Sequence, residues 1–235
     1  MTPKDRLIVA LDFPTAAAAL AHVDQLDNQV LWFKVGLELY LAAGNSIIEA
    51  LTARGHKVFL DLKLHDIPNT VASAVRTASR TGAGLLTLHA TGGPAMLQAA
   101  AEAAATTPGS PRLLAVTVLT SISALELAAI GIPTLPAAQV LRLAQLATAA
   151  GIPGLVCSPQ EVADLRRTLP PETLLVVPGI RSSTAAPDDQ TRTADAPTTI
   201  AAGASMLVIG RPITQAPNPA QAAANFLQQI AAAKP

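Results

Sequence analysis

Short apolar runs recur along the whole chain, separated by longer stretches with helical character, and this alternation constrains the fold more than any other feature. The runs are rich in Val, Ile and Leu, as are strands of parallel sheets that are buried on both faces. Strands that alternate with helices predict successive parallel βα units. Eight candidate strands are present, at residues 7–13, 31–36, 58–64, 85–90, 113–119, 154–158, 174–180 and 206–210.

The stretches between the runs carry signals for helix starts and stops. Ser158, Pro159 and Glu161 form a capping-box sequence, in which serine caps the helix and proline suits its first turn. Asn218 and Pro219 mark the start of the last helix in a similar way. Glycines stand where helices should end before the next strand, a place that commonly requires left-handed backbone; they are Gly55, Gly82, Gly151 and Gly203.

No composition break, charge run or linker divides the 235 residues. A chain of this length suits either one closed α/β barrel or two small domains. Successive βα units without a boundary favour a single (β/α)8 TIM barrel domain over residues 1–235 and disfavour an open sheet. Residues 184–199, rich in Ala, Pro, Asp and Thr, are predicted to form one long loop. In such barrels the chemistry takes place on loops at the carboxyl ends of the strands.

The charge balance, the cysteine content and the first residues limit the partners and the compartment that we expect. Sixteen basic residues balance sixteen acidic ones, so no broad positive field exists to collect nucleic acid or anionic lipid. A bound anion must therefore be held by local groups. Cys157 is the single cysteine, which excludes an internal disulfide. Met1 is followed by TPKDR instead of the apolar core of a secretory signal, and we expect a cytoplasmic protein.

Residues 113–141 contain a single charged residue, Glu126, and are long enough to span a membrane. Thr117, Thr120 and Ser121 interrupt the apolar stretch, and prolines follow Gly131. This pattern is more typical of a buried strand, a loop and a helix start. We therefore expect no membrane association.

Polar residues gather at the predicted strand ends. Lys34 lies on the second predicted strand, Asp61 and Lys63 on the third, and His89 ends the fourth. Side chains two residues apart on a strand face the same way, so Asp61 and Lys63 should project together, away from the leucines that alternate with them. Other residues at strand ends are Asp12, Thr120, Ser121, Arg181, Gly210 and Arg211.

The charges on the third strand invite two interpretations. Burying either charge alone in an apolar barrel costs roughly several kcal/mol, so such groups persist when they are paired or useful. With Lys34 and Asp66 they form a candidate array of four charges, which could simply plug the barrel mouth with ion pairs. The alternation of two lysines with two aspartates favours the second interpretation, in which one ammonium is held beside a reacting centre.

Residues 61–70, DLKLHDIPNT, closely resemble the DxKxxD signature segment of orotidine 5′-phosphate decarboxylases. Residues 8–12, 33–36, 116–121, 177–181 and 208–214 also resemble segments of that family, in the same order, so the resemblance spans almost the whole chain. It implies a TIM-barrel enzyme that converts orotidine 5′-phosphate to uridine 5′-phosphate, the last step of UMP biosynthesis, without a cofactor.

The resemblance also implies roles for the charged residues. Lys63 would stabilise the carbanion at C6 of the pyrimidine and protonate it. Lys34, Asp61 and Asp66 would be its charged neighbours, with Asp61 close to the substrate carboxylate. Asp66 would come from the second subunit of a homodimer with shared active sites.

Further residues would contact the substrate or cross the subunit interface. Ile67 and Thr70 would cross the interface with Asp66. The substrate-binding residues implied by the resemblance are Asp12 and Lys34 at the ribose, Thr120 and Ser121 near the pyrimidine, and Gln190, Gly210 and Arg211 at the phosphate, with Arg181 beside them.

The sequence offers no alternative electron sink. It contains no pattern for binding pyridoxal phosphate, thiamine or a dinucleotide, and its four histidines and one cysteine make no recognised metal site. The electrons left at C6 lie in an orbital that the ring cannot delocalise, so catalysis would depend on preorganised charges. Whether Asp61 also destabilises the bound substrate stays open.

Two other functions compete with this interpretation. Related sugar-phosphate barrels, such as keto-gulonate-phosphate decarboxylase and hexulose-phosphate synthase, share a DxKxxD element but use magnesium. They carry a metal-binding glutamate near the position of Lys34, where an ammonium would repel the cation, so we expect no metal here. A silent barrel that binds nucleotides as a sensor or scaffold would have no need to keep both lysines and three aspartates.

Overall fold

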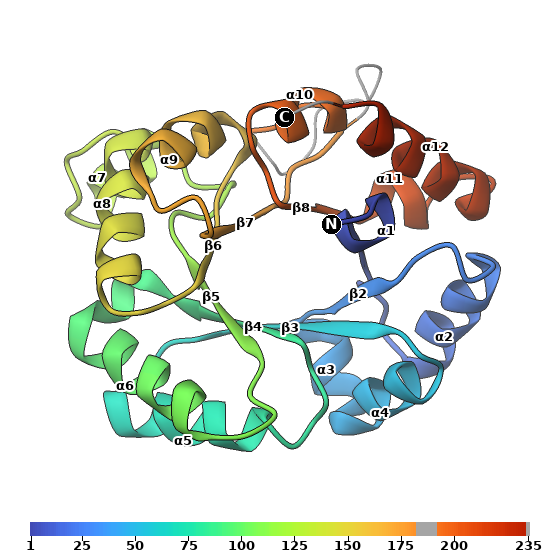
Figure 1. The fold of residues 1–235 in the computed structure, drawn as a ribbon, viewed down its shortest axis with the longest axis horizontal. Coiled ribbons are helices and arrows are strands. Elements are labelled where there is room, and N and C mark those ends of the chain that lie inside the picture. Colours follow the sequence, from blue (N-terminus) through green and yellow to red (C-terminus); the bar gives the residue numbers. More distant parts are fainter. Residues whose placement is uncertain (182–191, 234–235) are drawn as a thin grey trace.

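Eight parallel strands in the described part of the chain close into a barrel in sequence order, and helices surround it (Figure 1). The computed structural model describes residues 1–181 and 192–233. The strands are β1 (Leu7–Ala10), β2 (Trp32–Val35), β3 (Lys57–Leu64), β4 (Leu85–His89), β5 (Arg112–Val116), β6 (Gly154–Val156), β7 (Leu174–Val177) and β8 (Met206–Ile209). The predicted TIM-barrel fold is confirmed.

The helices follow the strands around the outside of the barrel. The α-helices are α1 (Pro3–Arg6), α2 (Ala16–Gln25), α3 (Leu37–Ala43), α4 (Asn45–Ala53), α5 (Pro68–Ala78), α6 (Gly93–Thr106), α7 (Ala124–Ala129), α8 (Pro136–Ala149), α9 (Val162–Thr168), α10 (Ala196–Ala201), α11 (Arg211–Thr214) and α12 (Pro219–Ala232). Short 3-10 helices, η1 (Ala90–Gly92) and η2 (Pro159–Glu161), follow β4 and β6.

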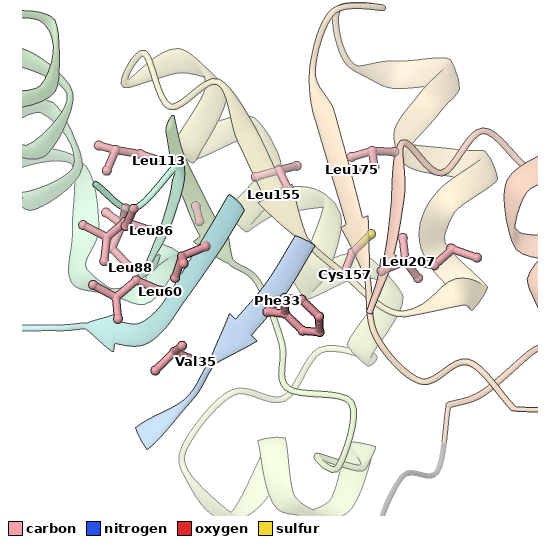
Figure 2. Close-up of a cluster of buried hydrophobic side chains, with 14 of the residues drawn as sticks. Phe33, Val35, Leu60, Leu86, Leu88, Leu113, Leu155, Cys157, Leu175 and Leu207 are labelled. Carbon is pink, nitrogen blue, oxygen red and sulfur yellow. The ribbon is translucent and has the colours of Figure 1, made fainter. Parts of the chain in front are cut away.

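Each strand contributes side chains to two cores. Inside the barrel, Ile8 of β1 packs in a cluster with Phe59, Val176 and other inward residues. Leu7 and Val9, its neighbours along the strand, belong to the larger cluster between strands and helices, part of which Figure 2 shows. Because both faces of the sheet are buried, the strands read as continuous apolar runs in the sequence.

Most strands are shorter than the apolar runs that predicted them. β1 ends at Ala10 and β7 at Val177, although their runs continue to residues 13 and 180. The last residues of these shortened runs leave the sheet and build the loops at its carboxyl end. This is the end of the barrel where the predicted site residues lie.

The predicted helix signals are present. Ser158 and Glu161 form a capping box, and the Asn218 side chain accepts a hydrogen bond from the backbone N–H of Gln221 at 3.0 Å. The glycines predicted to end helices have positive φ; they are Gly55, Gly82, Gly151 and Gly203. Residues 113–141 form β5, a loop that contains α7, and the start of α8. No helix within the described ranges is long and apolar enough to cross a membrane.

The predicted loop at residues 184–199 ends earlier than expected. Helix α10 begins at Ala196, and the carboxylate of Asp195 accepts the N–H of Thr198 at 2.8 Å. The prediction is therefore wrong for residues 196–199, because the Asp195 cap and Pro197 in the first turn start a helix there in spite of the loop-like composition. Residues 184–191 lie outside the described residues.

Candidate active site

A cavity of about 250 Å³ opens at the carboxyl end of the barrel. Residues of the inner core, among them Phe59 and Val156, form its apolar part. The polar and glycine residues that line it come from the loops after the strands and from β2 and β3; they are Asp12, Lys34, Asp61, Lys63, Thr120, Gly179, Arg181, Gly210 and Arg211. Among the described residues, four cationic and two acidic side chains line this cavity, so it suits an anionic ligand.

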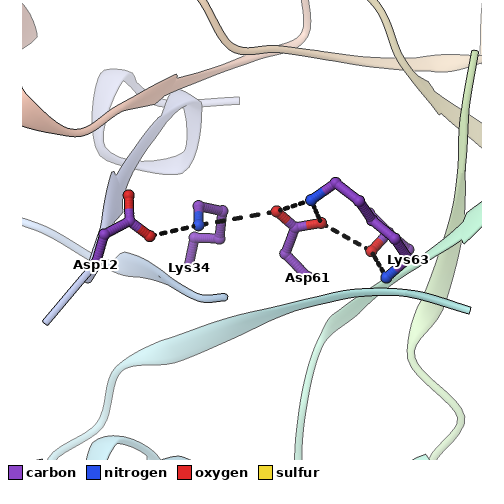
Figure 3. Close-up of polar contacts among 5 residues, drawn as sticks. Asp12, Lys34, Asp61 and Lys63 are labelled. Carbon is purple, nitrogen blue, oxygen red and sulfur yellow. Dashed lines mark hydrogen bonds and ion pairs between the residues drawn. The ribbon is translucent and has the colours of Figure 1, made fainter. Parts of the chain in front are cut away.

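Four charged side chains form a continuous chain of ion pairs across the cavity (Figure 3). The Lys34 Nζ atom lies 2.9 Å from Asp12 Oδ1 and 3.8 Å from Asp61 Oδ2. The Lys63 Nζ atom lies 2.9 Å from both carboxylate oxygens of Asp61. Both ammonium groups are therefore held by a shared carboxylate.

The backbone of β3 departs from a regular strand where these charges lie. Between the paired positions Leu60/Leu86 and Leu64/Leu88, β3 advances by four residues while β4 advances by two. Lys63 has a φ of 52°, in the left-handed region that residues other than glycine rarely adopt. Sequence alternation correctly placed the leucines of this segment toward the outer core, but it did not predict the irregular backbone that carries Lys63.

Asp61 is ionised in spite of its burial. Only 8% of the residue is exposed. Burial raises the pKa of its carboxyl group, but the nearby charges of Lys34 and Lys63, with hydrogen bonds from Lys63 and Thr87, lower that pKa more, to below its ordinary value. The site thus contains a fixed, buried negative charge between two ammonium groups.

Thr120, Arg181 and Gly210 border the same cavity from the loops after β5, β7 and β8, and Arg211 borders it from the start of α11. The loops after strands 7 and 8 are a frequent phosphate-binding place in TIM barrels. Two guanidinium groups at this end of the cavity can make bidentate, charge-assisted hydrogen bonds to such a group. These residues are distant from Asp61 and Lys63 in the sequence, but they line the same cavity.

Several predicted site residues lie outside the cavity of their own chain. Asp66 is exposed, and its carboxylate accepts the backbone N–H of Ile67 at 2.6 Å. Ile67 is 66% exposed, and Thr70 and Ser121 are exposed as well. Gln190 lies outside the described residues.

Two polar residues that the sequence analysis did not single out contact the site. The buried hydroxyl of Thr87 bonds to Asp61, and the buried guanidinium of Arg192 donates to the backbone oxygens of Val118 and Leu119, which line the cavity. Thr87 could have been noticed as a lone polar residue in the apolar run at residues 85–90. Nothing in the sequence around Arg192 indicates its contact with a loop more than seventy residues away.

Comparisons with known proteins show which family the chain resembles. Residues 5–226 match the model of the orotidine 5′-phosphate decarboxylase / HUMPS family. The chain is 51% identical over 223 residues to an orotidine 5′-phosphate decarboxylase of Anaeromyxobacter sp. strain K, covering 95% of this chain and 97% of that protein. A decarboxylase of the same name from Halorhodospira halophila is 51% identical over 228 residues, covering 97% of each chain.

A solved structure is similar as well. The crystal structure of orotidine 5′-phosphate decarboxylase from Lactobacillus acidophilus matches 97% of this chain and 100% of that chain with a TM-score of 0.86 and 38% sequence identity.

Proposed function

The chain belongs to the orotidine 5′-phosphate decarboxylase / HUMPS family, and we propose that it converts orotidine 5′-phosphate to uridine 5′-phosphate and CO2 without a cofactor. The observation that carries this proposal is the Lys63 ammonium, held 2.9 Å from both oxygens of the buried Asp61 carboxylate in a cavity with excess positive charge. Relatives about half identical over nearly their full length, all named orotidine 5′-phosphate decarboxylase, support the same reaction.

Lys34 favours this reaction over the magnesium-dependent chemistry of the sugar-phosphate members. Its ammonium lies 2.9 Å from Asp12 and 3.8 Å from Asp61, so it neutralises the carboxylates that a divalent cation would need. Within the described residues, no group of three or more His, Cys, Asp or Glu side chains could hold a metal ion. We propose that the site residues of this chain act on the substrate directly.

In the proposed mechanism, the Lys63 ammonium stabilises the negative charge that develops at C6. The bond between C6 and the carboxylate breaks, CO2 leaves, and the electron pair remains on C6. The proton then moves from Lys63 Nζ to C6, and the neutral amine takes a proton from solvent. An ammonium fixed before the reaction begins stabilises the carbanion without reorganisation, which is the main source of electrostatic catalysis.

Asp61 and its neighbours keep that ammonium in place. Asp61 bonds to Lys63 through both carboxylate oxygens, and Lys34 and Asp12 extend the chain of charges toward the ribose. We propose that Arg181, Gly210 and Arg211, with Gln190, bind the phosphate. Thr120 lines the cavity and would border the pyrimidine, and Ser121, which is next to it in the chain, would join it there. Binding energy from the remote phosphate can lower the barrier at C6 by holding the substrate in its reactive position.

We further propose that the enzyme is a homodimer with shared active sites. Asp66 is exposed and does not line the cavity of its own chain, which leaves that residue available to a partner. Ile67, after β3, is 66% exposed, and Leu37, the first residue of α3 after β2, is 51% exposed. Apolar side chains exposed at the mouth of the barrel are suited to an interface in which Ile67 and Thr70 cross to the second subunit.

We also propose the domain organisation, the compartment and the absence of one class of partner. Residues 1–235 function as a single domain, the enzyme works in the cytoplasm, and it has no nucleic-acid partner. The balance of sixteen basic and sixteen acidic residues supports the last statement.

The activity is tested by following the loss of orotidine 5′-phosphate absorbance with purified protein in the presence of a chelator. We expect turnover to uridine 5′-phosphate at an undiminished rate. Activity that disappears under chelation and returns with magnesium would instead assign the chain to the metal-dependent chemistry of its family.

A further inference from the structure

Thr87 is a fully buried polar residue in the middle of β4, with an exposed fraction of 0%. Its neighbours Leu86 and Leu88 face the outer core. Thr87 therefore faces the barrel interior, directly behind the charges that line the cavity. A buried hydroxyl must be hydrogen-bonded, or its desolvation destabilises the protein.

The hydroxyl of Thr87 makes two hydrogen bonds whose directions are fixed by chemistry. The backbone N–H of Lys63 can only donate, so the hydroxyl oxygen accepts it, at 2.9 Å. The hydroxyl proton is then free to be donated to Asp61 Oδ1, also at 2.9 Å. A single side-chain atom thus links the backbone of Lys63 to the carboxylate that holds the Lys63 ammonium.

The regular hydrogen bonds between β3 and β4 are interrupted where Thr87 contacts Lys63. The register between β3 and β4 shifts between Leu60 and Leu64, so the regular ladder is interrupted at Lys63. Lys63 also has a φ of 52°, a conformation that persists only when surrounding contacts hold it. The Thr87 hydroxyl takes the place of the missing ladder partner for the Lys63 N–H.

We propose that Thr87 is a positioning residue, which uses its hydroxyl to fix the Lys63 backbone and the Asp61 carboxylate in one arrangement. The proposal rests on the proposed function, in which Lys63 donates the proton. Thr87 does not line the cavity, so its loss should affect the rate of the chemical step more than substrate binding.

The test compares pairs of variants that differ only in a hydroxyl. Thr87→Val keeps the shape of the side chain and removes both hydrogen bonds. We expect kcat to fall by about 30-fold or more, with KM changed by less than about threefold, because preorganisation is lost while the binding groups remain. Thr87→Ser should keep kcat within about fivefold of the wild-type value, whereas Thr87→Ala should resemble the valine variant.

Thr199→Val is the matched control. Thr199 is 1% exposed, and its hydroxyl donates to the Asp195 backbone oxygen in α10, away from the cavity. It removes a buried hydroxyl from a place that does not contact Lys63 or Asp61, so it should leave kcat unchanged.

Equal kcat values for Thr87→Val and Thr199→Val would overturn the proposal. If the valine variant does not fold, equal kcat values for the serine and alanine variants would overturn it in the same way. A wild-type protein with no decarboxylase activity would reject the proposed function instead, so the two failures are distinguishable.

Discussion

Glu161 and Arg192 form a buried ion pair that ties together three loops at the carboxyl end of the barrel. Their exposed fractions are 5% and 8%, and the Arg192 Nη1 atom lies 2.5 Å from Glu161 Oε1. Glu161 also accepts hydrogen bonds from the backbone N–H and the hydroxyl of Ser158. Replacing Glu161 with Gln keeps the shape but leaves the Arg192 charge buried without a counter-ion.

Glu161→Gln should lower the free energy of unfolding, because it removes one partner of a buried ion pair. Removing one partner of a buried ion pair typically costs about 3–5 kcal/mol. A protein of this size loses about 2–4 °C in Tm for each kcal/mol, so the expected decrease is roughly 6–20 °C. Thermal unfolding followed by circular dichroism, at one fixed protein concentration because association can shift Tm, measures it.

An exposed ion pair on α9 supplies the control. The Arg167 Nη2 atom lies 2.5 Å from Asp164 Oδ1, but these side chains are 77% and 64% exposed. Asp164→Asn should therefore change the stability by no more than about 1 kcal/mol. Equal changes in Tm for Glu161→Gln and Asp164→Asn would show that burial does not set the strength of these pairs and would refute the reasoning.

Three further predictions concern the active site. Arg211→Ala should lower kcat/KM by roughly a hundredfold or more, because a charge-assisted bond to the phosphate is lost; unchanged steady-state kinetics would remove Arg211 from the phosphate site. Burial raises the pKa of Asp61, but Lys34 and Lys63 lower it more, so the folded pKa lies below the ordinary value. The ionised carboxylate therefore stabilises the fold at pH values above the unfolded pKa of about 4. This stabilisation disappears as the pH falls through the lower, folded pKa. Denaturant unfolding between about pH 5 and pH 2 should therefore show a larger loss of stability for wild type than for Asp61→Asn, and parallel curves would contradict this. Mixed Lys63→Ala and Asp66→Ala proteins should regain activity after subunit exchange if each site uses both chains, and no recovery would count against the shared site.

The sequence predicted the barrel because its signals are local and repeated. Each apolar run, such as residues 7–13, is followed by a helical stretch, and glycines such as Gly151 end the helices before the next strand. Closure of the barrel then follows from the number of units and the absence of a boundary between them. The prediction of a loop was wrong at residues 196–199, where the composition is typical of a loop but the Asp195 side chain caps a helix.

The candidate site was predictable only in part. The charges at Lys34, Asp61 and Lys63 are visible in the sequence because charged residues are rare in apolar strands. The contact of Thr87 with Lys63 depends on a register shift that no local pattern of β3 reveals. The contact of Arg192 with Val118 depends on tertiary packing between distant loops.

The role of Lys63 is tested most directly by Lys63→Ala, measured as the rate of uridine 5′-phosphate formation with folding verified by circular dichroism. If its ammonium stabilises and protonates C6, kcat should fall at least about a thousandfold, equivalent to about 4 kcal/mol of barrier. A folded Lys63→Ala protein that turns over orotidine 5′-phosphate at a near-normal rate would contradict the mechanism.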